Sequence, residues 1–249
     1  MRALLLVVVL LPLLLVRAQV SPSPNDDRPR VLLFSRTTGF RHDAIPVAAS
    51  AIARLGADNG FAVDLTEDPA AFDDATLGGY AAVVFLLTTG DVLAPDGRAA
   101  FERYVRAGHG YAGVHSATDT EYGWPWYGGL VGAYFAGHPA IQPAVLRVED
   151  ATHPSTAGLP PTWERTDEWY DFRVNPRGAV QVLLTLDERS YAGGSMGADH
   201  PIAWYHAYDG GRAWYTAMGH TGESYLEPAF LAHLLGGIQY AAGLSRPSA

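Results

Sequence analysis

Apolar residues occur along the first half of the chain in short blocks separated by amphipathic stretches. The blocks are short, and polar residues or glycines bound them, which is typical of buried strands. They span residues 30–35, 61–68, 81–90 and 111–116. Helical patterns lie between them, one from Pro46 to Gly60 and one over residues 94–110. This alternation predicts an α/β, flavodoxin-like doubly wound, mostly parallel sheet with helices on both faces.

The second half has a less regular pattern. Residues 144–150 and 179–188 read as strands, and residues 200–221 read as a hairpin that turns at Asp209-Gly210-Gly211. A closing helix is expected over residues 228–242. No internal repeat or second boundary interrupts residues 30–245, so one domain is expected there.

The first residues have the pattern of a targeting segment. An apolar run follows Arg2, and Ala18 ends a short stretch with small residues at the positions that a signal peptidase reads. We expect a signal peptide over residues 1–18 with cleavage after Ala18, then a flexible leader over residues 19–29. The expected location is secreted or periplasmic, with no stable membrane insertion after cleavage.

Composition excludes several chemistries. The chain has no Cys and no Lys, so all 17 basic residues are Arg. Thiol nucleophiles, thiolate metal sites and lysine Schiff bases are therefore impossible. The formal net charge is −9 and no basic run occurs, so nucleic acid is not an expected partner.

The stretch "YAGVHSATD" places a histidine where many α/β enzymes carry a nucleophile. Small residues around His115 allow a sharp turn after a buried strand. In such sheets ligands bind beyond the carboxyl ends of the strands. We therefore expect His115 to act in a site there, with His42 and Asp119 as substrate contacts from neighbouring loops. A serine hydrolase using Ser116 is a weaker alternative, because Ser116 lies one position late.

Further candidates follow later strands. His220 follows an apolar strand in "AMGHTGESY", and Asp167 and Glu168 precede two aromatic residues. Because adjacent strand residues point to opposite sides, only one of these two carboxylates should face the site, as a general base or a metal ligand. His115, His220, Glu168 and Asp167 are thus the candidate catalytic residues.

Aromatic residues provide candidate pocket walls, since sugar rings pack on aromatic faces. Trp126 and Tyr170 are the two that we expect to contact substrate. His138, His153 and His200 each precede a proline. Proline favours an extended conformation in the residue before it, so we expect these histidines to be structural.

Five motifs together resemble the trehalose-utilisation (ThuA-like) family, which has a class I glutamine amidotransferase-like fold. They are "TTGFRHDAI", "GYAGVHSATDTEYGWPWYGGLVGAYFAGHP", "HPSTAGLP", "DEWYDF" and "AMGHTGESY". In amidotransferases of this fold the sharp turn carries a Cys and a late strand carries a His. Here His115 occupies the turn, and His220 matches the late histidine. The resemblance implies a sugar substrate, such as a keto-sugar made by a partner sugar dehydrogenase.

Two hypotheses follow. The first is an exported enzyme that performs acid–base chemistry on a disaccharide or keto-sugar, as a hydrolase, lyase or isomerase. A divalent metal such as zinc could assist, held by His115, His220 and Glu168. The alternative is a non-catalytic carbohydrate-binding protein that has lost the nucleophile. Both exclude a glutamine amidotransferase, because no thiolate is available.

Overall fold

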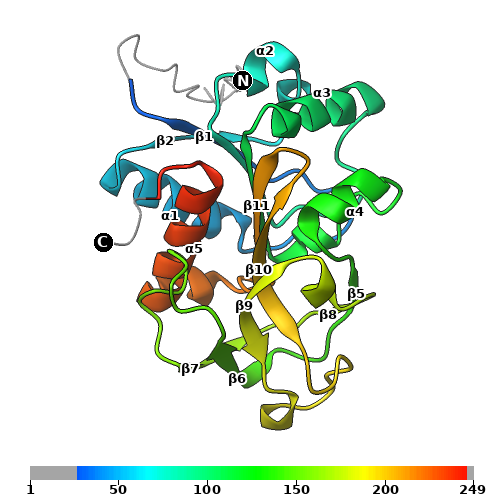
Figure 1. The fold of residues 1–249 in the computed structure, drawn as a ribbon, viewed down its shortest axis with the longest axis vertical. Helices are drawn as coiled ribbons and strands as arrows, with labels where there is room; N and C mark the ends of the chain where they lie inside the picture. Colours follow the sequence, from blue (N-terminus) through cyan, green and yellow to red (C-terminus); the bar gives the residue numbers. More distant parts are fainter. Residues whose placement is uncertain (1–26, 246–249) are drawn as a thin grey trace, which may run out of the picture.

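A nine-stranded sheet forms the centre of the molecule in a computed structural model that describes residues 27–245. Its strand order is β2-β1-β3-β4-β11-β10-β9-β6-β7 (Figure 1). The first five strands in this order are parallel. They are β1 (Arg30–Phe34), β2 (Ala62–Thr66), β3 (Ala82–Leu86), β4 (Gly110–Val114) and β11 (Gly211–Thr216). The expected flavodoxin-like α/β sheet is thereby confirmed.

The remaining strands extend the sheet in an antiparallel arrangement. They are β6 (Gln142–Val148), β7 (Thr162–Asp167), β9 (Gln181–Leu186) and β10 (Pro201–Tyr208). A separate two-stranded sheet pairs β5 (Phe135–Gly137) with β8 (Asp171–Phe172). The hairpin of β10 and β11 turns where the sequence predicted, whereas β5, β7 and β8 were not predicted.

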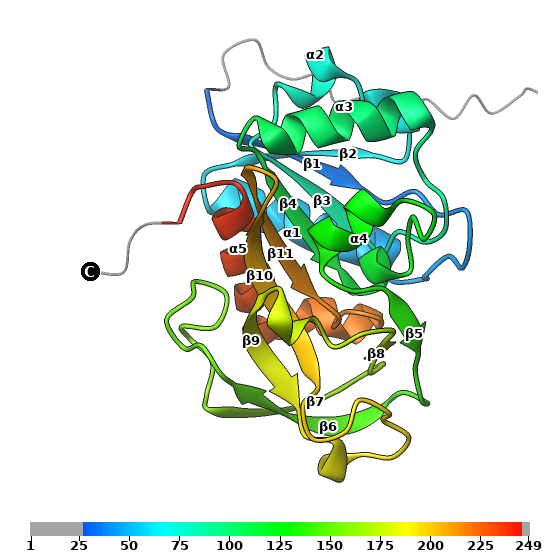
Figure 2. The same ribbon diagram turned by 45° about the vertical axis from the view of Figure 1, so that its right-hand side comes forward.

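Helices cover both faces of the parallel part (Figures 1 and 2). One face carries α1 (Ile45–Asp58) and α5 (Pro228–Ala241), and the other carries α2 (Asp74–Leu77), α3 (Pro95–Arg106) and α4 (Pro125–Val131). Short 3₁₀ helices lie in the connections. They are η1 (Pro69–Ala71), η2 (His115–Thr118), η3 (Pro176–Gly178), η4 (Glu188–Ser190) and η5 (Gly222–Leu226).

Glycines let α5 lie directly on the sheet. A Cβ at Gly110 in β4 would stand 1.9 Å from the carbonyl oxygen of Ala241, and one at Gly237 would meet the Trp214 ring at 2.2 Å. Helix and strand can approach this closely only because neither position carries a side chain. The buried core is continuous from this interface to Phe85 of β3 and Tyr111 of β4, whose rings pack against Phe101 of α3.

The expected signal peptide and most of the expected leader lie outside the described residues. Within residues 27–245, no helix is long and apolar enough to cross a membrane.

Candidate functional site

Four side chains from separate parts of the chain converge at the carboxyl ends of the parallel strands. His42, His115, Glu168 and His220 each offer one ligand atom, and these atoms all lie within 4.8 Å of one another. His42 precedes α1, His115 follows β4, and His220 follows β11. We call these four residues the histidine–glutamate cluster. It lies where ligands bind in doubly wound sheets.

The turn after β4 has the geometry expected of a strained elbow. His115 has a φ of 53°, in the left-handed region that residues with a side chain rarely adopt. A Cβ at Gly113 would stand 2.7 Å from the Tyr111 hydroxyl and 3.0 Å from the Tyr215 ring, so only glycine fits beside the turn. The backbone therefore projects the His115 side chain into the cluster.

Hydrogen bonds fix the orientation of the His115 ring. Its Nδ1 lies 2.6 Å from the carbonyl oxygen of Ala217, which can only accept, so Nδ1 carries the hydrogen. In the neutral ring Nε2 then has a free lone pair directed at Glu168 and His220. A backbone carbonyl that fixes the tautomer in this way is a common partner of metal-binding histidines.

The distances among three of the ligand atoms suit a small divalent ion. His115 Nε2 lies 3.1 Å from His220 Nδ1 and 3.4 Å from Glu168 Oε2. His220 Nδ1 lies 3.0 Å from the same oxygen. Ligand atoms around a tetrahedral zinc ion with bonds of about 2.0–2.1 Å are roughly 3.3 Å apart. The three distances between these ligand atoms are thus close to those expected around a tetrahedral zinc ion.

His42 completes the set of donors. Its ring packs edge-on against the rings of His115 and His220, with both centroid distances 5.0 Å. Its Nδ1 is buried and has no hydrogen-bond partner within the described residues. Burial, together with the charges of His115 and His220, lowers the pKa of His42 to about 3. His42 is therefore neutral, the form in which imidazole binds metals.

Glu168 and His220 are electrostatically coupled. Burial alone would raise the pKa of Glu168, but the adjacent imidazoles of His115 and His220 outweigh this effect and hold the pKa below its usual range. Burial alone would lower the pKa of His220, but its hydrogen bond to Glu168 and the charge of Glu168 raise it. Glu168 is therefore a carboxylate, available as a ligand or a base.

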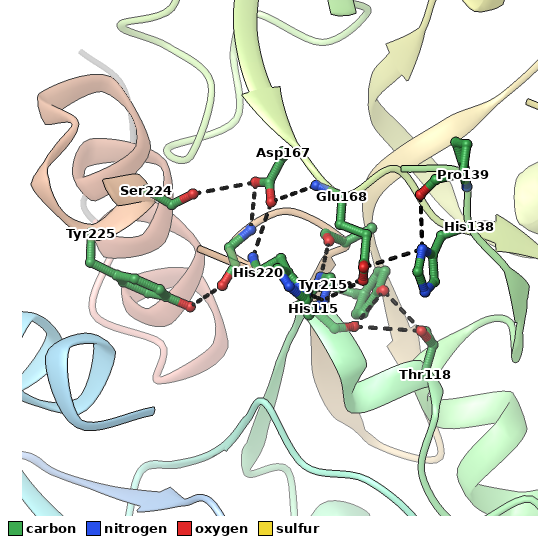
Figure 3. Close-up of polar contacts among 12 residues, drawn as sticks. His115, Thr118, His138, Pro139, Asp167, Glu168, Tyr215, His220, Ser224 and Tyr225 are labelled. Carbon is green, nitrogen blue, oxygen red and sulfur yellow. Dashed lines mark hydrogen bonds and ion pairs between the residues drawn. The ribbon is translucent and has the colours of Figure 1, made fainter. Parts of the chain in front are cut away.

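Asp167 positions the segment that carries His220. It accepts hydrogen bonds from the backbone N–H groups of Gly219 at 2.8 Å and His220 at 3.1 Å. Figure 3 shows the contact with His220. Asp167 is also paired with Arg165 at 2.6 Å. As the alternation of side chains along a strand requires, Glu168 faces the cluster and Asp167 points away from it. Asp167 is thus a positioning residue and does not belong to the cluster.

Tyr170, His138 and Phe135 border the cluster. Tyr170 packs on the His115 ring with a centroid distance of 4.2 Å. His138 Nδ1 lies 3.1 Å from Glu168 Oε1 (Figure 3). His138 is expected from the sequence to be structural; in the structure it follows β5 directly and lies beside Glu168. The proline that follows it gave no signal of this contact.

The structure places the other predicted residues as follows. Asp119 ends the turn that begins at His115, and its Oδ1 accepts a hydrogen bond from the Tyr122 hydroxyl at 2.7 Å. Burial raises the pKa of Asp119. The expectation for Trp126 was wrong: it lies on α4, donates to Asp209 and packs on Trp124, so it is not brought to the cluster.

Ser116 is not available as a nucleophile. Its hydroxyl oxygen is fully buried and has no hydrogen-bond partner among the described residues. A serine nucleophile needs an adjacent base within hydrogen-bond reach and an accessible oxygen. The serine-hydrolase alternative therefore has no support in this geometry.

Comparisons with known proteins agree with this fold. The sequence model of the ThuA family, described as trehalose utilisation, matches residues 30–241. A ThuA-like protein from Bacteroides uniformis has a similar structure, with a TM-score of 0.73 and 25% identity over 89% of this chain and 95% of that one. A ThuA-like protein from Parabacteroides merdae has a TM-score of 0.73 and 22% identity over 87% and 91%.

More distant structures share the fold alone. A β-galactosidase from Bacillus circulans has a TM-score of 0.58 and 12% identity, over 89% of this chain and 32% of that one. A search of curated proteins found no match. The family match extends over most of the sequence and confirms the resemblance seen in the motifs. The chain therefore belongs to the ThuA, or trehalose-utilisation, family.

Proposed function

We propose that this protein is an exported enzyme that transforms a disaccharide or keto-sugar by metal-assisted acid–base chemistry. The observation that carries the proposal is the convergence of three histidines and one carboxylate at the carboxyl ends of the parallel strands. Membership of the trehalose-utilisation family supports the sugar substrate. A partner sugar dehydrogenase would supply the keto-sugar.

His42, His115, Glu168 and His220 would hold the ion. Three imidazoles and a buried carboxylate form a donor set typical of zinc. A bound divalent ion would act as a Lewis acid on a carbonyl or hydroxyl oxygen of the sugar.

Asp119 is our candidate for moving a proton in this site. Its carboxyl lies at the end of the turn that presents His115, and burial raises its pKa toward the range useful at neutral pH. The hydrogen bond from Tyr122 to Oδ1 leaves Oδ2 to exchange a proton with substrate. A divalent ion that held the keto oxygen of the sugar would make the neighbouring C–H group more acidic, so that the Asp119 carboxylate could accept its proton.

Metal content tests the first part of the proposal. We expect protein purified without chelator to contain a stoichiometric divalent ion by elemental analysis. Glu168→Gln should lose most of that ion, because an amide is a weaker ligand than a carboxylate. Glu164→Gln, on an exposed position of β7, is the matched control and should keep it. Wild-type protein that contains no metal, even after incubation with zinc, would contradict this part.

Turnover tests the second part. The wild-type protein should convert a 3-keto-disaccharide, whereas His115→Ala should lose at least 100-fold in kcat/KM while remaining folded; this factor is the order expected for general acid–base or ligand loss. Unchanged rates in a folded His115→Ala variant would refute the catalytic assignment. Sugar binding without product and without metal would instead identify a carbohydrate-binding protein.

A further inference from the structure

We propose that His138 is a fifth residue of the site and that its two ring nitrogens have separate roles. Nδ1 holds Glu168 in the orientation that the cluster needs, and Nε2 accepts a hydrogen bond from a sugar hydroxyl. This assignment rests on the proposed function, because it concerns the substrate and the metal of the same site.

The contacts of Nδ1 determine the tautomer of His138. Nδ1 lies 2.9 Å from the carbonyl oxygen of Pro139 and 3.1 Å from Glu168 Oε1. Figure 3 shows both contacts converging on this nitrogen. A carbonyl and a carboxylate can only accept, so Nδ1 carries the hydrogen.

Because of this contact, the two carboxylate oxygens of Glu168 have different partners. Oε1 is held by His138, while Oε2 faces His115 at 3.4 Å and His220 at 3.0 Å. The carboxylate therefore presents a single oxygen to the cluster. Partners of this kind, one step outside the ligands, commonly change metal affinity by about 10–100-fold.

The other ring nitrogen faces away from these partners. In the neutral ring Nε2 is a hydrogen-bond acceptor, and it has no hydrogen-bond partner within residues 27–245. The His138 side chain is 40% exposed, compared with 8% for Glu168 and 0% for His115. His138 is thus more exposed than the residues of the cluster that it contacts, although the His220 side chain is also 21% exposed. A substrate that approaches the cluster from solvent would meet this acceptor.

Aromatic packing keeps the acceptor in place. The His138 ring lies 5.9 Å from the Tyr170 ring at an interplanar angle of 25°, and 5.9 Å from the Phe135 ring. Tyr170 and Phe135 pack together at 4.3 Å. Tyr170 is only 3% exposed, so the partly exposed rings of Phe135 and His138 form the aromatic surface beside the acceptor. Such a surface suits a sugar, which offers both an apolar C–H face and hydroxyl donors. The ligand class is therefore a polyhydroxylated ring.

Two substitutions separate the two roles. In His138→Asn the amide nitrogen takes the place of Nδ1 and the outer acceptor is lost. In His138→Gln the amide lies near the place of Nε2 and the bond to Glu168 is lost. We would measure zinc affinity by competition with a chromophoric chelator, and trehalose affinity by calorimetry on the zinc-loaded protein.

The two proposed roles of His138 predict opposite effects of the two substitutions on zinc affinity and trehalose affinity. His138→Asn should keep its zinc affinity within about twofold and lose about tenfold in trehalose affinity, as expected for one lost hydrogen bond. His138→Gln should lose about tenfold in zinc affinity and keep its trehalose affinity within about threefold. His138→Ala should lose both. Thermal unfolding of all three variants should match the wild type, because the ring is half exposed.

Other outcomes overturn the assignment. Wild-type affinities in both variants would remove His138 from the site. Equal losses of both affinities in His138→Asn and His138→Gln would overturn the division of roles. Wild-type protein that binds neither zinc nor trehalose would refute the proposed function itself, and this assignment with it. Wild-type binding that the variants leave unchanged refutes only the role of His138.

Discussion

His115 adopts the backbone conformation that related folds use to expose a nucleophile. The turn itself requires the φ of 53° at His115 and a glycine at position 113. Neither requirement depends on which side chain stands at the tip of the turn. The same turn can therefore present an imidazole lone pair instead of a thiolate. The hydrogen bond from His115 Nδ1–H to the carbonyl oxygen of Ala217 fixes the tautomer of the ring. A histidine that binds a metal needs a fixed tautomer, whereas a nucleophilic thiolate does not.

Asp167→Asn tests how strongly the cluster depends on residues behind it. An asparagine amide would direct N–H groups at the N–H donors of Gly219 and His220, or at the Arg165 guanidinium. We expect zinc affinity to fall about 10–100-fold. The free energy of unfolding should fall by about 3–5 kcal/mol, since a buried ion pair loses one partner.

Glu164→Gln is the control for Asp167→Asn, because it makes the same kind of change on an exposed position of β7. It should change the free energy of unfolding by no more than about 0.5 kcal/mol. Chelator competition and urea unfolding measure the two effects. If Asp167→Asn destabilised the fold but left zinc affinity unchanged, Asp167 would not position His220.

Among the elements, β7 explains why part of the site could not be predicted. Strand β7 lies at the far edge of the sheet, yet its last residues contact the segment that follows β11. The strand is also rich in charge: Arg165 and Asp167 are buried in it, which removes the apolar signal of a strand. The sequence pattern identified the two carboxylates, but it did not identify the strand or the contacts of Asp167 with the segment after β11.

Gly110→Ala tests the close contact of α5 with β4. The added methyl group would lie 1.9 Å from the Ala241 carbonyl, so the helix must move away from the strand. Overpacking of this kind costs about 1–3 kcal/mol of unfolding free energy, measured by urea unfolding. Gly158→Ala is the control, because its Cβ would meet nothing within 4 Å. Equal, small losses in both variants would show that α5 adjusts freely.

For the whole molecule, the parallel half was predictable and the antiparallel half was only partly so. Apolar blocks and helical periods revealed β1 to β4 and α1 and α3, because local burial determines them. His42, His115 and His220 follow from this, since parallel strands end at one edge. His138 does not, because its approach to Glu168 depends on β5 and β8, whose few residues carry no periodic signal.

Acid should destabilise the molecule at the contact between α5 and the loop at residues 149–161. His233 of α5 donates from Nδ1 to the carbonyl oxygen of Ser155 at 2.8 Å, while its Nε2 is buried without a partner among the described residues. Burial lowers the pKa of His233 to about 3, and burial lowers that of His153 in the same loop to about 4. Both rings are therefore neutral in the folded protein.

The sign of the pH effect follows from these pKa values. The unfolded chain, with histidine pKa values near 6.5, binds protons between pH 6.5 and 3 that the folded protein does not. Stability is thus complete above about pH 6.5 and falls as the pH decreases toward 4 and 3, by about 1.4 kcal/mol per pH unit for each histidine.

His233→Asn keeps an N–H donor for Ser155 but cannot titrate. Its loss of unfolding free energy between pH 8 and pH 5 should be about 2 kcal/mol smaller than that of the wild type, by urea unfolding. Gln239→Asn in the same helix removes no titratable group and should retain the wild-type difference; an unchanged difference in His233→Asn would mean that His233 does not contribute to acid sensitivity.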